Sequence, residues 1–88
     1  MIFTILYNNY KVINRSLTQL RKTNTLNLPI VALDNHYPTL TKAQKTRLKK
    51  KFDLKIIDPK ENLGLGGGYN RLFSYYTNIR YAILYDCD

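Results

Sequence analysis

Residues that could bind an anionic ligand and a metal ion are concentrated between Glu61 and Asn70 and at Asp86 and Asp88. All four glycines of the chain fall between positions 64 and 68, after an apolar run and before a segment with helical spacing. Glycines let the backbone adopt positive φ and approach a ligand closely. A glycine-rich loop that opens a helix also presents free N–H groups and the positive end of the helix dipole. Two carboxylates one residue apart offer oxygen ligands to a divalent cation. Together these features indicate a nucleoside-diphosphate site.

Other phosphate-binding motifs fit the glycine segment poorly. Tyr69 stands where a dinucleotide fingerprint has its last glycine, and the segment follows the third predicted strand instead of the first. No Gly-Lys-Ser/Thr sequence is present, which excludes a Walker loop. The alternative for the segment is a flexible turn, and for Asp86 and Asp88 it is a pair of solvated terminal charges. His36 has no carboxylate partner that the sequence reveals, so we expect a loop residue there.

Four apolar runs alternate with helical patterns along the chain. We expect strands at Ile2–Tyr7, Leu28–Leu33, Leu54–Asp58 and Tyr81–Tyr85, and helices at Tyr10–Lys22, Thr41–Phe52 and Tyr69–Tyr76. The second helix begins with a capping box, and its apolar stripe is expected to consist of Ala43, Leu48 and Phe52. Strict alternation predicts an α/β fold, namely a Rossmann-like three-layer sandwich with a mostly parallel sheet of about four strands in βαβαβαβ order. Ligands of such sheets bind beyond the carboxyl ends of the strands, where the polar residues of this chain gather.

Composition narrows the class of protein. The chain has 88 residues, which is enough for one domain, and its net charge is +8. Eight lysines and arginines fall between Lys42 and Lys60, so either a polyanionic partner or a solvated basic helix face is expected. A single cysteine, the absence of a signal-peptide pattern and apolar runs shorter than a membrane span favour the cytoplasm, including the inner face of a membrane.

The sequence resembles the N-terminal, nucleotide-binding half of family 2 glycosyltransferases with the A-type fold. The resemblance rests on Thr4 and Tyr7-Asn8 in and after the first strand, on Val31 to Asn35, on Glu61 to Asn70, and on the terminal Asp86-Cys87-Asp88. These features appear in the order of the family and span the whole chain. The segment that ends in Gly68-Tyr69-Asn70 is the most specific of them.

The resemblance implies a role for each matching residue. Asp34 would hydrogen-bond the nucleotide base, and Tyr7 and Asn8 would line the base and ribose pocket. Asp86 would face the ribose or the sugar, and Asp88, with Asp86 beside it, would hold Mn²⁺ or Mg²⁺. The donor would also pass close to Asn62, Gly64, Gly66, Gly67 and Gly68. Asn70 would help to hold the shape of this segment.

The resemblance further implies a metal-dependent enzyme that transfers a sugar from a nucleoside-diphosphate donor to a glycan or lipid-linked acceptor. In the family, the acceptor site and the catalytic base come from a second half. We therefore expect residues 1–88 to form a donor-binding half-domain that ends at the Asp-x-Asp motif, contains no catalytic base and is inactive alone. His36-Tyr37-Pro38 replaces the small serine-containing turn that is common in the family, so the resemblance does not identify the nucleotide base of the donor.

Two alternatives remain open from the sequence. The first is a small basic α/β module that binds nucleic acid or phosphorylated ligands through the Lys42–Lys60 segment. Aromatic and basic residues do not interleave as they do in RNA-binding modules, so nucleic acid is the less expected partner. The second is self-association through the exposed edge of a sheet that ends at its fourth strand.

Overall fold

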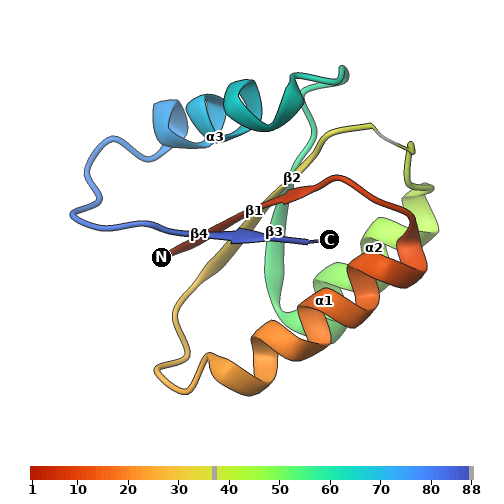
Figure 1. Cartoon of the computed structure of the whole chain (residues 1–88), viewed down its shortest axis with the longest axis horizontal. Helices are drawn as coiled ribbons and strands as arrows, with labels where there is room; N and C mark the ends of the chain where they lie inside the picture. Colours follow the sequence, from red (N-terminus) through yellow and green to blue (C-terminus); the bar gives the residue numbers. More distant parts are fainter. Residues whose placement is uncertain (37, 88) are drawn as a thin grey trace.

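The structure is a computed structural model, and it describes residues 1–36 and 38–87. Its elements are β1 (Ile2–Leu6), α1 (Tyr10–Thr23), β2 (Ile30–Asp34), α2 (Lys42–Phe52), β3 (Leu54–Ile57), α3 (Gly64–Tyr75) and β4 (Ile83–Asp86). The four strands form one parallel sheet in the order β3-β2-β1-β4 (Figure 1). This arrangement confirms the predicted α/β class, the element order and the parallel sheet.

The sheet lies between two helical layers. Figure 1 shows α1 and α2 on one side of the sheet and α3 on the other. Side chains of β1 alternate between the two sides, since Ile2 and Leu6 join the core beneath α1 and α2, whereas Phe3 and Ile5 join the core beneath α3. All five residues of β1 are buried, as expected for a strand that is covered on both faces.

Local signals placed the beginnings of the first two helices correctly. The Asn9 side chain accepts a hydrogen bond from the Val12 amide at 3.0 Å and so caps α1. The predicted capping box of α2 is present, with reciprocal bonds between Thr41 and Gln44. The predicted apolar stripe of α2 was wrong at Ala43, which is exposed. Its position lies five residues before the buried Leu48, roughly 140° around the helix.

The glycine segment was predicted to be a loop, and that prediction was wrong for most of it. Helix α3 begins at Gly64, which has a φ of 73°, and not near Tyr69. Gly68 is buried against the sheet, and a Cβ atom there would lie 2.8 Å from Cδ1 of Ile5. Glycine lowers helix propensity, but here its small size lets the helix pack close to β1, and that packing outweighs the propensity.

Strand boundaries shift by one or two residues from the prediction. Strands β2 and β4 begin two residues later and end one residue later than expected, while β1 and β3 each end one residue earlier. Leu28 precedes β2 because both of its backbone polar groups are bonded to the Asn24 side chain instead of a neighbouring strand. Strand β4 forms one edge of the sheet, and its Ile83 and Leu84 side chains are 53% and 50% exposed.

In the part of the chain that the structure describes, no helix combines the length and the apolar character that crossing a membrane requires.

Candidate functional site

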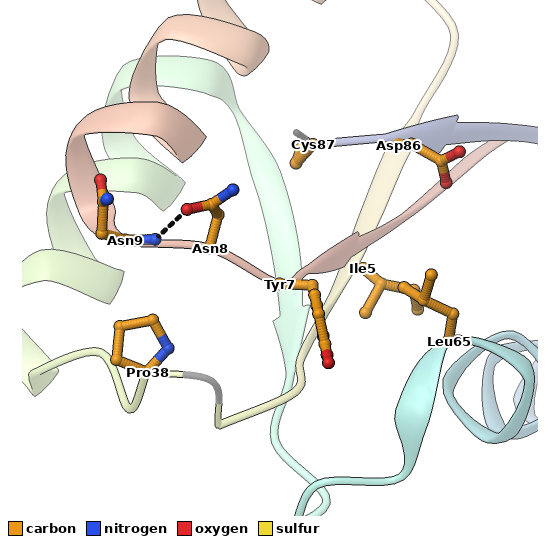
Figure 2. A pocket seen from close by; sticks show the side chains of 8 residues that line it. All are labelled: Ile5, Tyr7, Asn8, Asn9, Pro38, Leu65, Asp86 and Cys87. Carbon is orange, nitrogen blue, oxygen red and sulfur yellow. Dashed lines mark hydrogen bonds between the residues drawn. The ribbon is translucent and has the colours of Figure 1, made fainter.

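A cavity of about 480 Å³ lies at the carboxyl ends of β1 and β4 (Figure 2). Its lining consists of Ile5, Tyr7, Asn8, Asn9, Pro38, Leu65, Asp86 and Cys87. Ile5 and Asp86 are paired in the parallel register of β1 and β4, so the exits of these two strands are adjacent. The cavity has the volume typical of small-molecule sites. It brings together three of the predicted donor-binding residues: Tyr7, Asn8 and Asp86.

Helix α3 positions the side chain of Asp86. The hydroxyl of Tyr69 donates a hydrogen bond to Oδ1 of Asp86 at 2.9 Å. Burial raises the pKa of the Tyr69 hydroxyl, and the hydrogen bond to Asp86 and its negative charge raise that pKa further. The phenol therefore stays protonated and remains a donor at neutral pH. Sequence reasoning gave Tyr69 no role, although it lies inside the glycine-rich segment.

The residues on either side of Asp86 fix the end of β4. Oγ1 of Thr4 and Sγ of Cys87 lie 3.1 Å apart in the interior. The hydroxyl of Tyr85 donates to the carbonyl oxygen of Ser16 in α1 at 2.9 Å. Because its two neighbours are anchored to β1 and α1, Asp86 is presented to the cavity from a fixed backbone while remaining exposed to solvent.

Asp34, the predicted base-binding residue, lies at the end of β2 but outside the cavity lining. Its side chain is 0% exposed. Its Oδ1 accepts a hydrogen bond from the backbone amide of His36 at 3.0 Å, and its Oδ2 lies 3.3 Å from Nζ of Lys45. The structure therefore turns this carboxylate toward α2, and base recognition by Asp34 stays a prediction.

His36 lies in the loop after β2, as predicted, but it has a carboxylate partner that the sequence did not reveal. Its Nε2 lies 2.5 Å from Oδ1 of Asp58, which follows β3, and Nζ of Lys45 lies 3.1 Å from Oδ2 of Asp58. Burial alone would raise the pKa of the Asp58 carboxyl, but hydrogen bonds from His36, the Lys60 amide and Lys45 hold it well below its ordinary value. His36 and Asp58 meet because they follow β2 and β3, which are neighbouring parallel strands.

Lys45 carries the positive charge of this network. Burial lowers the pKa of its ammonium, but hydrogen bonds to Asp58 and Asp34 and the charges of both carboxylates raise the pKa above its ordinary value. Lys45 was predicted only as a member of the basic segment. Its inward orientation depends on the tertiary position of α2, which the sequence pattern did not reveal.

Two places at the strand ends could hold a metal ion. Within residues 1–36 and 38–87, one ligand atom from each of Asp34, His36 and Asp58 lies within 4.8 Å of the others. Nζ of Lys45 already lies within ion-pair distance of the carboxylates of Asp34 and Asp58, so a metal ion there would have to displace an ammonium group. Asp86, in contrast, is exposed and lines the cavity, and its oxygen ligands suit Mn²⁺ or Mg²⁺. Asp88, the other predicted metal ligand, lies outside the described residues.

The predicted glycine segment contributes to the cavity mainly through Leu65. The remaining predicted positions are not part of the cavity lining: Asn62, Gly64, Gly66, Gly67, Gly68 and Asn70. The side chain of Asn62 accepts a hydrogen bond from the Gly64 amide at 2.9 Å, and Asn70 lies on an exposed face of α3. Asn62 and Gly64 thus shape the beginning of the helix that holds Leu65.

Asn35 is a structural residue that the sequence singled out only as the end of the segment from Val31 to Asn35. Its side chain is fully buried, and Oδ1 accepts a hydrogen bond from the Leu63 amide at 2.9 Å. The bond connects the end of β2 to the beginning of α3 across 28 residues of sequence. Its place beside Asp34 at a strand exit was the only signal available.

A parallel α/β sheet with a ligand-sized cavity at its carboxyl edge is typical of α/β domains that bind a ligand at that edge. The family model described as Glycosyl transferase family 2 matches residues 1–88. The chain therefore belongs to glycosyl transferase family 2 and is a glycosyltransferase domain of that family. Neither the curated proteins nor the solved structures contain a significant match to this chain.

Proposed function

We propose that this chain is the donor-binding part of a metal-dependent glycosyltransferase and binds a nucleoside-diphosphate sugar in the cavity at the carboxyl ends of β1 and β4. The observation that carries the proposal is the meeting of Tyr7, Asn8 and Asp86 around one cavity at the exits of two parallel strands. Figure 2 shows Leu65, at the beginning of α3, on the same side of the cavity as Asp86 and Ile5.

In this proposal, the aromatic ring of Tyr7 and the amide of Asn8 contact the base and the ribose. Asp86 and Asp88 hold Mn²⁺ or Mg²⁺. The ion supplies Lewis-acid stabilisation of the diphosphate leaving group when it is bound. The anchored end of β4 supports this assignment, because a metal ligand on a fixed backbone loses little conformational freedom when it binds.

Asp34 is proposed to shape the base pocket indirectly, through the backbone that leads to a cavity-lining residue. It holds the backbone amide of His36 at the beginning of the turn that carries Pro38, and Pro38 lines the cavity. Asn62, the glycines from Gly64 to Gly68, and Asn70 are proposed to set the start of α3 near the donor. Direct contact between Asp34 and the base would require its carboxylate to leave Lys45.

The sugar is proposed to pass to a glycan or lipid-linked acceptor. Among the described residues that line the cavity, Asp86 is the one carboxylate, and the proposal assigns it to the metal and the donor. A base for the acceptor hydroxyl is then not supplied at this cavity. We propose that residues 1–88 bind the donor without transferring the sugar.

Isothermal titration calorimetry with UDP, dTDP, GDP and CMP, each with and without Mn²⁺, tests the proposal. We expect saturable binding of one nucleoside diphosphate that disappears when a chelator removes the ion, and the preferred nucleotide identifies the base. If none of these nucleotides binds in the presence of Mn²⁺, the donor-site proposal is wrong.

A further inference from the structure

The positive charge of the chain is concentrated in one helical layer. Helices α1 and α2 carry ten of the fourteen lysine and arginine residues and none of the six acidic residues. The rest of the chain holds four basic and all six acidic residues. The net charge of +8 therefore arises entirely from the layer that covers one side of the sheet.

Nine of these ten side chains are exposed, and together we name them the basic face. The members are Lys11, Arg15, Arg21, Lys22, Lys42, Arg47, Lys49, Lys50 and Lys51. In α1, the buried residues Ile13, Leu17 and Leu20 leave the opposite side of the helix to Lys11, Arg15 and Lys22. Only Lys45 turns inward, toward Asp34 and Asp58.

The two helices present one continuous surface. Nη1 of Arg21 donates a hydrogen bond to the carbonyl oxygen of Lys51 at 2.7 Å, and Nζ of Lys51 donates to Oδ1 of Asn14 at 2.8 Å. Figure 1 shows α1 and α2 running side by side along their length. Their exposed cations therefore belong to one packed helical layer.

Folding does not account for this distribution of charge. Lys11 and Arg15, and likewise Arg47 and Lys51, are like charges four residues apart, an arrangement that destabilises a helix. A solvated protein surface normally mixes both signs. Nine unmixed cations on two packed helices indicate an anionic surface as the partner.

We propose that the basic face docks on an anionic phospholipid bilayer. Leu26, three residues beyond the end of α1, is 80% exposed and supplies an apolar side chain beside the cationic end of that helix. Clustered cations are attracted to the negative surface of an acidic membrane, and an exposed apolar side chain adds a smaller contribution when it is buried at the membrane interface.

A nucleic-acid partner fits the same face less well. Proteins that bind single strands stack the bases on exposed aromatic side chains. The aromatic residues of α1 and α2 are Tyr10, which is half-buried, and Phe52, which is buried. None of the nine cations lines the nucleotide cavity, so docking can be tested separately from donor binding.

Vesicle co-sedimentation of the whole chain tests the proposal, with vesicles of phosphatidylcholine alone or with about one-third phosphatidylglycerol. We expect binding to the anionic vesicles only, with a loss of at least about tenfold between about 50 and about 300 mM salt. The face variant, Lys11→Gln/Arg15→Gln/Lys22→Gln, should bind at least about tenfold more weakly. Leu26→Ser should also bind more weakly, without a change in salt dependence.

The control variant Lys55→Gln/Lys60→Gln/Arg80→Gln removes the same number of exposed charges away from the basic face and should retain binding. The proposal is overturned if the chain does not sediment with anionic vesicles, or if the face and control variants lose binding equally. Tighter binding to a fluorescein-labelled single-stranded RNA than to the vesicles at equal salt also overturns it, in favour of nucleic acid. Unchanged binding of Leu26→Ser would contradict apolar insertion.

Discussion

The hydroxyl of Tyr69 donates a hydrogen bond to Oδ1 of Asp86 at 2.9 Å and so connects the glycine-rich helix α3 to the exit of β4. Helix α3 can deliver this hydroxyl because Gly68 packs directly against Ile5 of β1. The position of a proposed metal ligand thus depends on the close approach of a helix to the sheet.

Replacing Tyr69 with Phe should weaken metal-dependent nucleotide binding by at least about tenfold, because a hydrogen bond to a charged carboxylate contributes roughly 1.5–3 kcal/mol. Tyr75→Phe, at an exposed position of α3, is the matched control. Titration calorimetry with the preferred nucleotide and Mn²⁺ measures both. Equal affinities of the two variants would show that Tyr69 does not position Asp86.

Tyr69→Phe should also change stability at high pH. The folded-state pKa of Tyr69 is raised, so the unfolded chain releases this proton first, from about pH 10 upward. Above that pH the unfolded state binds fewer protons, and the free energy of unfolding falls as the pH rises. Urea unfolding at about pH 8 and about pH 11 should show a smaller loss for Tyr69→Phe than for Tyr75→Phe.

Gly68→Ala and Gly66→Ala should change stability in opposite directions. A Cβ at position 68 would lie 2.8 Å from Ile5, whose side chain is buried, so overpacking should cost roughly 1–3 kcal/mol. A Cβ at position 66 would have no neighbour within 4 Å, and alanine should stabilise the helix there by roughly 0.5–1 kcal/mol. Urea midpoints measure both changes. Stabilisation by Gly68→Ala would contradict the close packing of α3.

Lys45→Met should destabilise the fold by about 2–4 kcal/mol, because it removes the cation beside the buried carboxylate of Asp34. Lys49→Met removes an exposed charge of the same helix and should change the free energy of unfolding by less than about 0.5 kcal/mol. Both values come from urea unfolding at neutral pH. Equal effects of the two substitutions would mean that the ion pair with Asp34 contributes nothing to stability.

Ionisation of Asp58 should make the free energy of unfolding depend on pH in the acidic range. Its folded-state pKa is lowered, so its contribution is complete above the unfolded value of about 4 and is lost as the pH falls below it. Asp58→Asn should therefore cost roughly 1–3 kcal/mol at neutral pH and progressively less below about pH 4. Asp53→Asn, at the exposed end of α2, serves as the control. A cost for Asp58→Asn that is the same at pH 7 and at about pH 3 would contradict the assignment.

Patterns of neighbouring residues predicted most of the fold. The continuous apolar run of β1 and the Thr41–Gln44 capping box each depend on residues close in sequence, and each was confirmed. The predicted boundaries of β2 and β4 were wrong by one or two residues. At β2, the side-chain bonds of Asn24 to Leu28 decide where the ladder begins.

Contacts between residues that are far apart in the chain could not be predicted from the sequence pattern. Asp58 reaches His36 across 22 residues because two parallel strands end side by side. The helical state of Gly64 to Gly68 depends on packing against Ile5, which outweighs the local preference of glycine. Likewise, the burial of Asp34 beside Lys45 follows from the position of α2, so this residue, which was predicted to contact the base, is not part of the cavity lining.

The donor-site proposal is tested most directly by measuring how tightly the Asp86→Asn variant binds the preferred nucleoside diphosphate in the presence of Mn²⁺. The Asp53→Asn variant is measured in the same way as the control. Both variants lose one exposed carboxylate, and asparagine suits the left-handed backbone of position 53. If Asp86 holds the metal and the donor, Asp86→Asn should lose at least about tenfold in affinity while Asp53→Asn binds as the unsubstituted chain does. Equal binding by the two variants would contradict a donor site at this cavity.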